Sequence, residues 1–197
     1  MTYYADLHIH SKWSIATSHN LNIEELTVAA CKKGVSVLGT GDCTHPSWLK
    51  ELADTLEPAE KGLFKVRSDI EHRLAPTIPT LCRSPVRYIL QAEVSTVYKK
   101  AGKTRKIHNL LYLPDLASAY RLIDALSPFG SLKSDGRPTV LMDAKDLVKI
   151  VLDVHSEAFV IPAHIWTPWF SVLGSKSRFN SIEECYEEFS PHIFAVE

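Results

Sequence analysis

The sequence lacks the segments that direct a protein to a membrane or to secretion. Residues 1–7 read MTYYADL, with neither the basic start nor the apolar stretch of a signal peptide. No apolar run approaches the roughly 18 residues that a membrane-spanning helix needs. We therefore expect a cytoplasmic protein that makes no membrane contact.

Cysteine is sparse, and no two cysteines form a C-x-x-C pair. The four cysteines stand at positions 31, 43, 82 and 185. In a reducing compartment this spacing predicts free thiols, and it excludes a cysteine-ligated zinc knuckle within these residues. Cys31 and Cys185 are expected to be small, buried apolar side chains.

An excess of charge of either sign is also absent. The formal net charge is −1, and charged residues make up 23% of the 197 residues. The chain is not a polycation, so any binding of nucleic acid must depend on a local patch. The length suits one domain with a sizeable core, and we expect residues 1–197 to form a single catalytic domain.

Short β-prone runs alternate with capped or amphipathic segments. The expected strands are 3–9, 35–40, 88–98, 105–112, 158–163 and 193–197, and the expected helices are 22–34, 114–126, 143–154 and 181–189. The opening order of strand, helix and strand predicts a parallel βαβ unit. Residues 57–85 are rich in proline, and we expect an excursion outside the barrel there.

This alternation fits either a β/α barrel or a doubly wound sheet. Polar candidates in or at the ends of the expected strands favour the barrel, because barrel active sites form at the carboxyl ends of the strands.

His8 and His10 form the sharpest local signal, in the run DLHIHS. Alternate residues of a strand face the same side, so the two imidazoles are presented together. Such a pair suits zinc, iron or manganese, although H-x-H alone is also compatible with an ordinary histidine pair.

Two carboxylates accompany the histidine pair. Asp42 follows a buried strand in GTGD, where it is either a metal ligand or a turn residue. Glu93 stands inside an apolar strand, where burial is costly unless the carboxylate is paired or binds a cation. A carboxylate in this position can bridge two metal ions, unless the strand is an edge strand with Glu93 on its solvent face.

His108 and His164 complete the candidate set, because each lies in or at the end of a further strand. Individually each is also compatible with a buried structural histidine, and His45 is a weaker candidate on a loop. The hypothesis of a metal site depends on the whole set, because several separate strands each carry a residue of a type that binds metal.

Two groups are candidates for contact with DNA. The densest basic stretch, at an expected hairpin turn, comprises Lys99, Lys100, Lys103, Arg105 and Lys106. Trp166 and Trp169 follow His164 on an expected loop, where they either stack on a base or close the core. The alternative for the basic stretch is a solvated hairpin tip that only aids solubility.

The strings DLHIHSKWS, VLGTGDCTHP, QAEVS, KIHNLL and PAHIWTPW together resemble the polymerase-and-histidinol-phosphatase (PHP) superfamily. The longer strings EVSTVYKKAGKTRKIHNLL and HIWTPWFSVLGSKS resemble its endonuclease Q branch. The resemblance runs along nearly the whole chain, with the motifs in the right order.

The resemblance implies a distorted (β/α)7 TIM-like barrel with two to three divalent metal ions, of which zinc is expected before manganese, iron or magnesium. It implies metal ligands at His8, His10, Asp42, Glu93, His108 and His164. It also implies a hydrolase that nicks DNA 5′ to a deaminated base (uracil, hypoxanthine or xanthine) or an abasic site. Metal-activated water would be the nucleophile, and no protein nucleophile is assigned.

Members of the superfamily continue beyond the equivalent of Glu197 to a further Asp-x-His motif that supplies ligands. We therefore expect this chain to be a fragment whose barrel is incomplete at its C-terminal end. Two alternatives to a DNA-repair endonuclease follow. The first is a small-molecule phosphatase of the histidinol-phosphate type, and the second is a metal-binding fragment without turnover.

Overall fold

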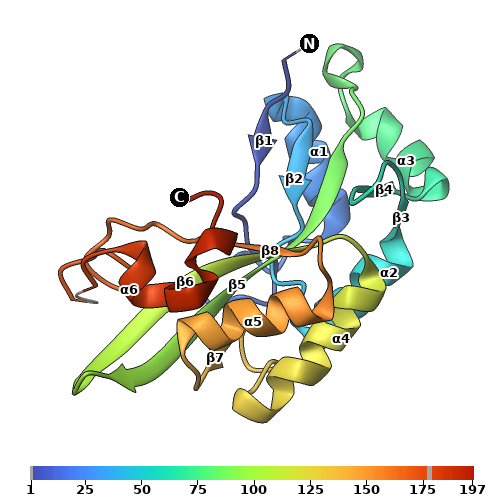
Figure 1. The fold of residues 1–197 in the computed structure, drawn as a ribbon. Helices are drawn as coiled ribbons and strands as arrows, with labels where there is room; N and C mark the ends of the chain where they lie inside the picture. Colours follow the sequence, from blue (N-terminus) through green and yellow to red (C-terminus); the bar gives the residue numbers. More distant parts are fainter. Residues whose placement is uncertain (1, 177–178) are drawn as a thin grey trace.

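The computed structural model describes residues 2–176 and 179–197. In these residues one curled, mixed sheet of eight strands carries helices packed against it (Figure 1). The strands are β1 Ala5–Asp6, β2 Val37–Gly39, β3 Leu56–Pro58, β4 Phe64–Val66, β5 Arg87–Lys100, β6 Lys103–Leu113, β7 Thr139–Val140 and β8 Phe159–Pro162.

The α-helices are α1 Ile23–Lys33, α2 Pro46–Thr55, α3 Ser68–Leu74, α4 Leu116–Leu126, α5 Ala144–Val154 and α6 Ile182–Tyr186. Four short 3₁₀ turns are η1 Ala75–Thr77, η2 Thr80–Cys82, η3 Ser127–Phe129 and η4 Glu187–His192. None of the helices in the described residues is long and apolar enough to cross a bilayer.

The predicted parallel βαβ unit at the start of the chain is confirmed. β1 pairs in parallel with β2, and α1 connects them. The side chain of Asn22 accepts a hydrogen bond from the Glu25 N–H, and Gly34 ends the helix at φ +71°. Both signals are local, so the sequence alone fixes these helix ends to within a residue.

β5 is the longest strand and organises the sheet around it. It pairs in parallel with β2 at its start and with β7 at Ser95, and it pairs antiparallel with β6 along most of its length. The hairpin turns at Ala101 and Gly102, which both have positive φ, as a two-residue type I′ turn requires. Because side chains alternate along a strand, Glu93 and Ser95 lie on the same face of β5.

Helices α4 and α5 lie side by side and pack against the sheet on β6 and β8. Each begins at an aspartate cap, since Asp115 accepts from the Ser118 N–H and Asp143 accepts from the Lys145 N–H. The main core lies between the sheet and the helices, and α1, α2 and α3 contribute to it as well as α4 and α5. A smaller apolar cluster lies at Leu110, Tyr112 and Ala163.

Several elements differ from the sequence-based expectation. The strand expected at 3–9 has only two paired residues, so His8 and His10 follow β1 instead of lying within it. The helix expected at 181–189 leaves α-helical geometry after Tyr186, because Glu187 has φ +49°. Residues 193–197 form no strand, although the Glu197 N–H donates to the carbonyl of Pro162.

The proline-rich segment 57–85 contains β4, which pairs with β5 at Tyr88 and so joins the sheet together with β3. Helix α2 was not expected from the sequence; Pro46 stands in its first turn. The mixed α/β class is confirmed. The finer expectation of a distorted (β/α)7 barrel stays a prediction.

Candidate metal centre

Glu93 lies at the centre of the site, in the middle of β5, and its side chain is 1% exposed. Its Oε1 is 2.7 Å from His108 Nδ1 and 3.3 Å from His164 Nε2. Its Oε2 is 3.2 Å from His10 Nε2 and 3.5 Å from His8 Nε2. Each carboxylate oxygen therefore faces its own pair of imidazoles.

This arrangement defines two overlapping groups of possible metal ligands that share one carboxylate. The first group is His8, His10 and Glu93, and the second is Glu93, His108 and His164. Ligand atoms around a tetrahedral zinc ion, with bonds of about 2.0–2.1 Å, lie roughly 3.4 Å apart. The distances of 3.2–3.5 Å between most neighbouring ligand atoms fit that geometry.

His10 is oriented from behind by Asp42, which is completely buried. Asp42 Oδ1 lies 2.9 Å from His10 Nδ1, and Oδ2 accepts hydrogen bonds from the backbone N–H and hydroxyl of Ser11 and from the Ser14 hydroxyl. Gly41, at φ +65°, permits this approach, because a Cβ there would lie 2.8 Å from the carbonyl oxygen of Ile9. A carboxylate on the far nitrogen of a ligating histidine fixes its tautomer and ring orientation.

His8 has a matching contact with Glu197, whose Oε1 lies 2.9 Å from His8 Nδ1. Glu197 Oε2 also accepts a hydrogen bond from the backbone N–H of His164. His164 has φ +33°, an uncommon conformation for a residue with a side chain, and its Nδ1 is 3.0 Å from the Thr167 hydroxyl. Both N-terminal histidines thus turn Nε2 toward Glu93 and Nδ1 toward a carboxylate.

The electrostatics of the cluster follow from this packing. Burial by itself would lower the pKa of His10, but the contacts with Asp42 and Glu93 outweigh it and raise that pKa to about 9. Burial would also lower the pKa of His8, but the contacts with Glu93 and Glu197 outweigh it and raise that pKa. Burial dominates at His108 and lowers its pKa. The surrounding imidazoles hold the pKa of Glu93 far below its usual range, against the effect of burial.

The donor set fits divalent metal ions. Glu93 Oε2 is buried and makes no hydrogen bond with any residue that the structure describes, although four imidazoles surround the carboxylate. A buried carboxylate oxygen without such a partner is costly unless a cation satisfies it. Imidazole nitrogen and carboxylate oxygen are ligands that zinc, iron and manganese accept.

Comparisons with known proteins found one similar sequence and two similar nuclease structures that bear on this site. An uncharacterized protein of Methanocaldococcus jannaschii is 29% identical over 201 residues, which are 92% of this chain and 21% of that protein. The lesion-specific endonuclease PfuEndoQ of Pyrococcus furiosus superposes on 95% of this chain with a TM-score of 0.75 and 27% identity. Endonuclease Q bound to a 27-mer duplex with an abasic lesion at its active site gives 0.74 over 93% of this chain, with 28% identity.

The resemblance to endonuclease Q is confirmed. This chain spans 40% of each endonuclease Q chain and about a fifth of the Methanocaldococcus protein. No family model matches the chain.

All six ligands that the resemblance to endonuclease Q implies lie in one cluster. Five of them belong to the two groups around Glu93, and Asp42 contacts His10 from outside them. His45 is turned away, because its Nδ1 caps α2 and its ring stacks on Trp13. Asp42 as a direct ligand stays a prediction.

The sequence analysis did not identify Arg137 or Glu197. Arg137 Nη1 lies 3.5 Å from Glu93 Oε2. Residue 137 comes just before β7, and a strand of two residues has no recognisable sequence pattern. Glu197 was interpreted only as the end of a strand. A buried glutamate surrounded by histidines signals that more charged groups are near, but the sequence does not say which.

The basic hairpin of β5 and β6 divides into two kinds of residue. Lys100 pairs with Glu187, and the buried Arg105 lies over the ring of Phe179 near Glu184. Lys99, Lys103 and Lys106 are exposed, and Lys106 lies 5.5 Å from the ring centre of Phe170. Trp166 and Trp169 are 76% and 59% exposed, so these two side chains do not close the core.

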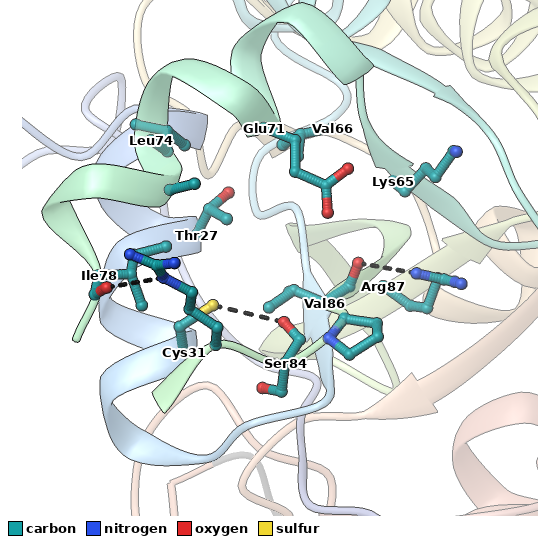
Figure 2. A pocket seen from close by; sticks show the side chains of 13 residues that line it. Thr27, Cys31, Lys65, Val66, Glu71, Leu74, Ile78, Ser84, Val86 and Arg87 are labelled. Atoms are coloured by element: carbon teal, nitrogen blue, oxygen red, sulfur yellow. Dashed lines mark hydrogen bonds between the residues drawn. The ribbon is translucent and has the colours of Figure 1, made fainter. Parts of the chain in front are cut away.

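A separate cavity of about 280 Å³ lies between α1, α3 and the start of β5 (Figure 2). Arg87 contacts the carbonyl of Val86 there, and the Cys31 thiol contacts the carbonyl of Ser84. The described lining residues form no metal-ligand group, and β5 runs from this cavity toward Glu93. We therefore assign the chemistry to the histidine cluster.

Proposed function

We propose that this chain carries the metal centre of a divalent-metal-dependent endonuclease. The proposed activity nicks DNA on the 5′ side of a deaminated base (uracil, hypoxanthine or xanthine) or of an abasic site. One observation carries the proposal, namely that a single buried carboxylate, Glu93, presents each of its oxygens to a separate pair of histidines.

Two ions are proposed at the two groups, with a third where further ligands are available, and zinc is preferred over manganese, iron and magnesium. When bound, such ions activate water and stabilise charge on the phosphoryl oxygens. His8 and His10 would hold one position, His108 and His164 would hold the other, and Glu93 belongs to both groups. Asp42 and Glu197 fix the orientation of the first pair.

We propose that DNA lies across the exposed part of the hairpin and the loop that follows His164. Lys99, Lys103 and Lys106 would contact phosphates, because their side chains are exposed. Lys100 pairs with Glu187, and Arg105 is buried near Glu184. Trp166 and Trp169 are exposed aromatic faces on which an unstacked base can lie.

Nicking of lesion-containing duplexes tests the proposed activity. End-labelled duplexes with one uracil, hypoxanthine, xanthine or abasic site are incubated with the zinc- or manganese-loaded protein, beside an undamaged duplex and p-nitrophenyl phosphate. We expect a single 5′ nick at the lesion that a chelator abolishes. Glu93→Gln should be inactive, whereas Glu25→Gln on the exposed face of α1 should match the unsubstituted protein.

Two other outcomes would reject the proposal. Hydrolysis of p-nitrophenyl phosphate without nicking would favour the small-molecule phosphatase. Metal binding without hydrolysis of any of these substrates would favour a metal-binding fragment without turnover.

The DNA-contact surface has its own test. Replacing Lys99, Lys103 and Lys106 together by alanine removes up to three phosphate contacts, so the slope of log K against log salt should flatten by about 0.9 for each contact on duplex DNA. Filter binding or fluorescence anisotropy at several salt concentrations measures the slope. Triple replacement of Lys32, Lys50 and Lys149 on distant helices is the matched control, and equal slopes for both variants would remove the claim.

A further inference from the structure

A second cavity adjoins the metal centre on the side of β7. Its volume is about 290 Å³, and it is lined by Ser95, His108, Asp135, Arg137, Thr139 and Phe170. His108 belongs to both the cavity and the second ligand group, so a molecule held at that group can extend into the cavity.

Two side chains of this cavity, Ser95 and Arg137, offer hydrogen-bond donors. Ser95 is 3% exposed, and its buried hydroxyl makes no hydrogen bond with a described residue. Arg137 Nη1 is 3.5 Å from Glu93 Oε2, which is longer than a normal hydrogen bond, and the side chain stays 40% exposed. A buried hydroxyl without a partner is costly, and a ligand in the cavity would satisfy it.

The backbone of Arg137 is held firmly beside the site. The Gly136 N–H donates to the carbonyl of Trp13, and the Arg137 N–H donates to Asp135 Oδ1. The same oxygen of Asp135 also accepts from the Ile15 N–H. A Cβ on Gly136 would lie 2.4 Å from Asp42 Oδ2. The backbone at residue 136 therefore packs directly against the carboxylate that orients His10.

Charge decides what such a group can bind. A guanidinium beside two divalent cations is repelled by them, and the Glu93 carboxylate that pairs with Arg137 would then also hold those cations. Arginine presents its donors as a planar fork that matches the oxygens of phosphate. The natural partner of Arg137 is therefore an anion that the metal ions hold at the same time.

We propose that Arg137 and Ser95 form a phosphate-oxygen subsite beside the metal centre. Arg137 binds a non-bridging oxygen of the phosphate at the metal ions, and the Ser95 hydroxyl donates to a second oxygen inside the cavity. This subsite rests on the proposed phosphoesterase function and names two residues that hold its substrate. The Ser95 hydroxyl lies on the side of the metal centre, because Ser95 and Glu93 share one face of β5.

Titration of inorganic phosphate into the zinc-loaded protein tests the subsite by calorimetry, with metal content measured for every variant. Arg137→Ala should weaken phosphate binding by about 10- to 100-fold, as loss of a charged hydrogen bond does. Arg137→Lys should retain part of the affinity. Arg121→Ala on α4, whose guanidinium contacts the Val154 carbonyl, is the matched control and should bind like the unsubstituted protein.

Ser95→Ala separates a binding role from a structural one. It removes a buried hydroxyl that has no partner, so thermal stability should be unchanged or higher while phosphate affinity falls several-fold. Equal phosphate affinity in Arg137→Ala with full metal content would overturn the subsite, even if the protein nicks DNA. Loss of metal from Arg137→Ala would also overturn it, since Arg137 would then only support Glu93.

Phosphate binding that depends on Arg137, in a protein that hydrolyses no phosphoester, would keep the subsite and reject the proposed activity. The two hypotheses therefore fail separately.

Discussion

Glu93 shows how one residue determines the character of a site. A carboxylate that is 1% exposed carries a large desolvation cost, and four imidazoles offset it by holding the charged form. The same contacts arrange four imidazole nitrogens around two positions beside the carboxylate. Without metal, Glu93 Oε1 contacts His108 and His164, whereas the buried Oε2 makes no hydrogen bond with a described residue. Bound ions would satisfy both oxygens.

Glu93→Gln should weaken metal binding at both positions, and His8→Ala should weaken it at only one. The amide keeps the shape but loses the charge, and its NH₂ group faces the histidines as a donor. We expect Glu93→Gln to bind less than half the metal of the unsubstituted protein, and His8→Ala to keep the position at His108 and His164. Metal content at fixed free zinc measures this. Equal metal in all three proteins would contradict it.

His10 predicts how metal uptake depends on pH. Its pKa is raised to about 9 by Asp42 and Glu93, against burial, so without metal the ring is protonated at neutral pH. Metal needs the neutral imidazole, so zinc affinity should rise from neutral pH to about pH 9, by up to about tenfold per pH unit from this group. The upward shift of the His8 pKa acts in the same direction, and Glu93 stays ionised throughout.

Competition with a chromophoric chelator across that pH range measures the effect. Asp42→Asn removes the carboxylate next to His10 and should move the rise to lower pH. A pH profile identical to that of the unsubstituted protein would show that Asp42 does not set the proton affinity of His10.

Most residues of the candidate site could be predicted from the sequence. Histidines and carboxylates at or near strand ends are unusual, and the ends of neighbouring strands lie close together in a sheet. The contacts that Asp42, Glu197 and Arg137 make could not be predicted from the sequence. Asp42 lies behind His10 because Gly41 allows a close approach, and Glu197 reaches His8 from the far end of the sequence. Such non-local contacts leave no spacing pattern.

At the scale of elements, the β5–β6 hairpin joins the site to the acidic segment that contains Glu184 and Glu187. Arg105 is 2% exposed and lies 4.0 Å from the ring centre of Phe179, so its side chain belongs to the fold. The sequence assigned it to DNA contact together with the lysines. That assignment is untested, and the packing favours a structural role.

Arg105→Ala should therefore lower the free energy of unfolding by roughly 1–3 kcal/mol, through lost packing and cation–π contact. Lys103→Ala, at the exposed tip of the same hairpin, should change it by less than about 0.5 kcal/mol. Urea denaturation of the two variants provides the comparison. Equal stability of both would show that Arg105 contributes little to the fold.

The segment before β7 makes a second prediction at this scale. Gly136→Ala places a methyl group against Asp42 and should cost roughly 1–3 kcal/mol of stability, as overpacking does. Weaker zinc binding should accompany it, because Asp42 orients His10. Ser134→Ala, on the exposed part of the same loop, is the control, and similar values for both would contradict the close packing.

Helix starts were the most predictable features, since the helices expected from 22, 143 and 181 begin there, and Asn22, Asp143 and Ser181 each accept a backbone hydrogen bond. Strands were less predictable, because pairing depends on distant partners. β1 has only two paired residues, and β7 exists only where it meets β5. Helix α2 had a signal that was missed, because proline is common in the first turn of a helix.

At the scale of the whole molecule, the ligands connect parts of the chain that are far apart. They come from the segment after β1, from β5 and β6, and from the end of β8. Ions bound there would link the two halves of the curled sheet. The mixed α/β fold and the resemblance to endonuclease Q were predictable, because the motifs appear in order along nearly the whole chain.

Metal removal should accordingly destabilise the whole fold. Saturation at 100 times Kd contributes about 2.7 kcal/mol, which corresponds to a fall in Tm of roughly 5–10 °C for a chain of this size. Thermal denaturation with and without a chelator measures it. A Tm that does not depend on metal would show that the site contributes nothing to the native state.

The most direct test of the central claim is the metal content per chain, measured by elemental analysis on protein purified without a metal-binding tag. We expect two or more zinc, iron or manganese ions per chain, bound around Glu93. Folded protein that takes up no metal, even after incubation with zinc, would contradict it.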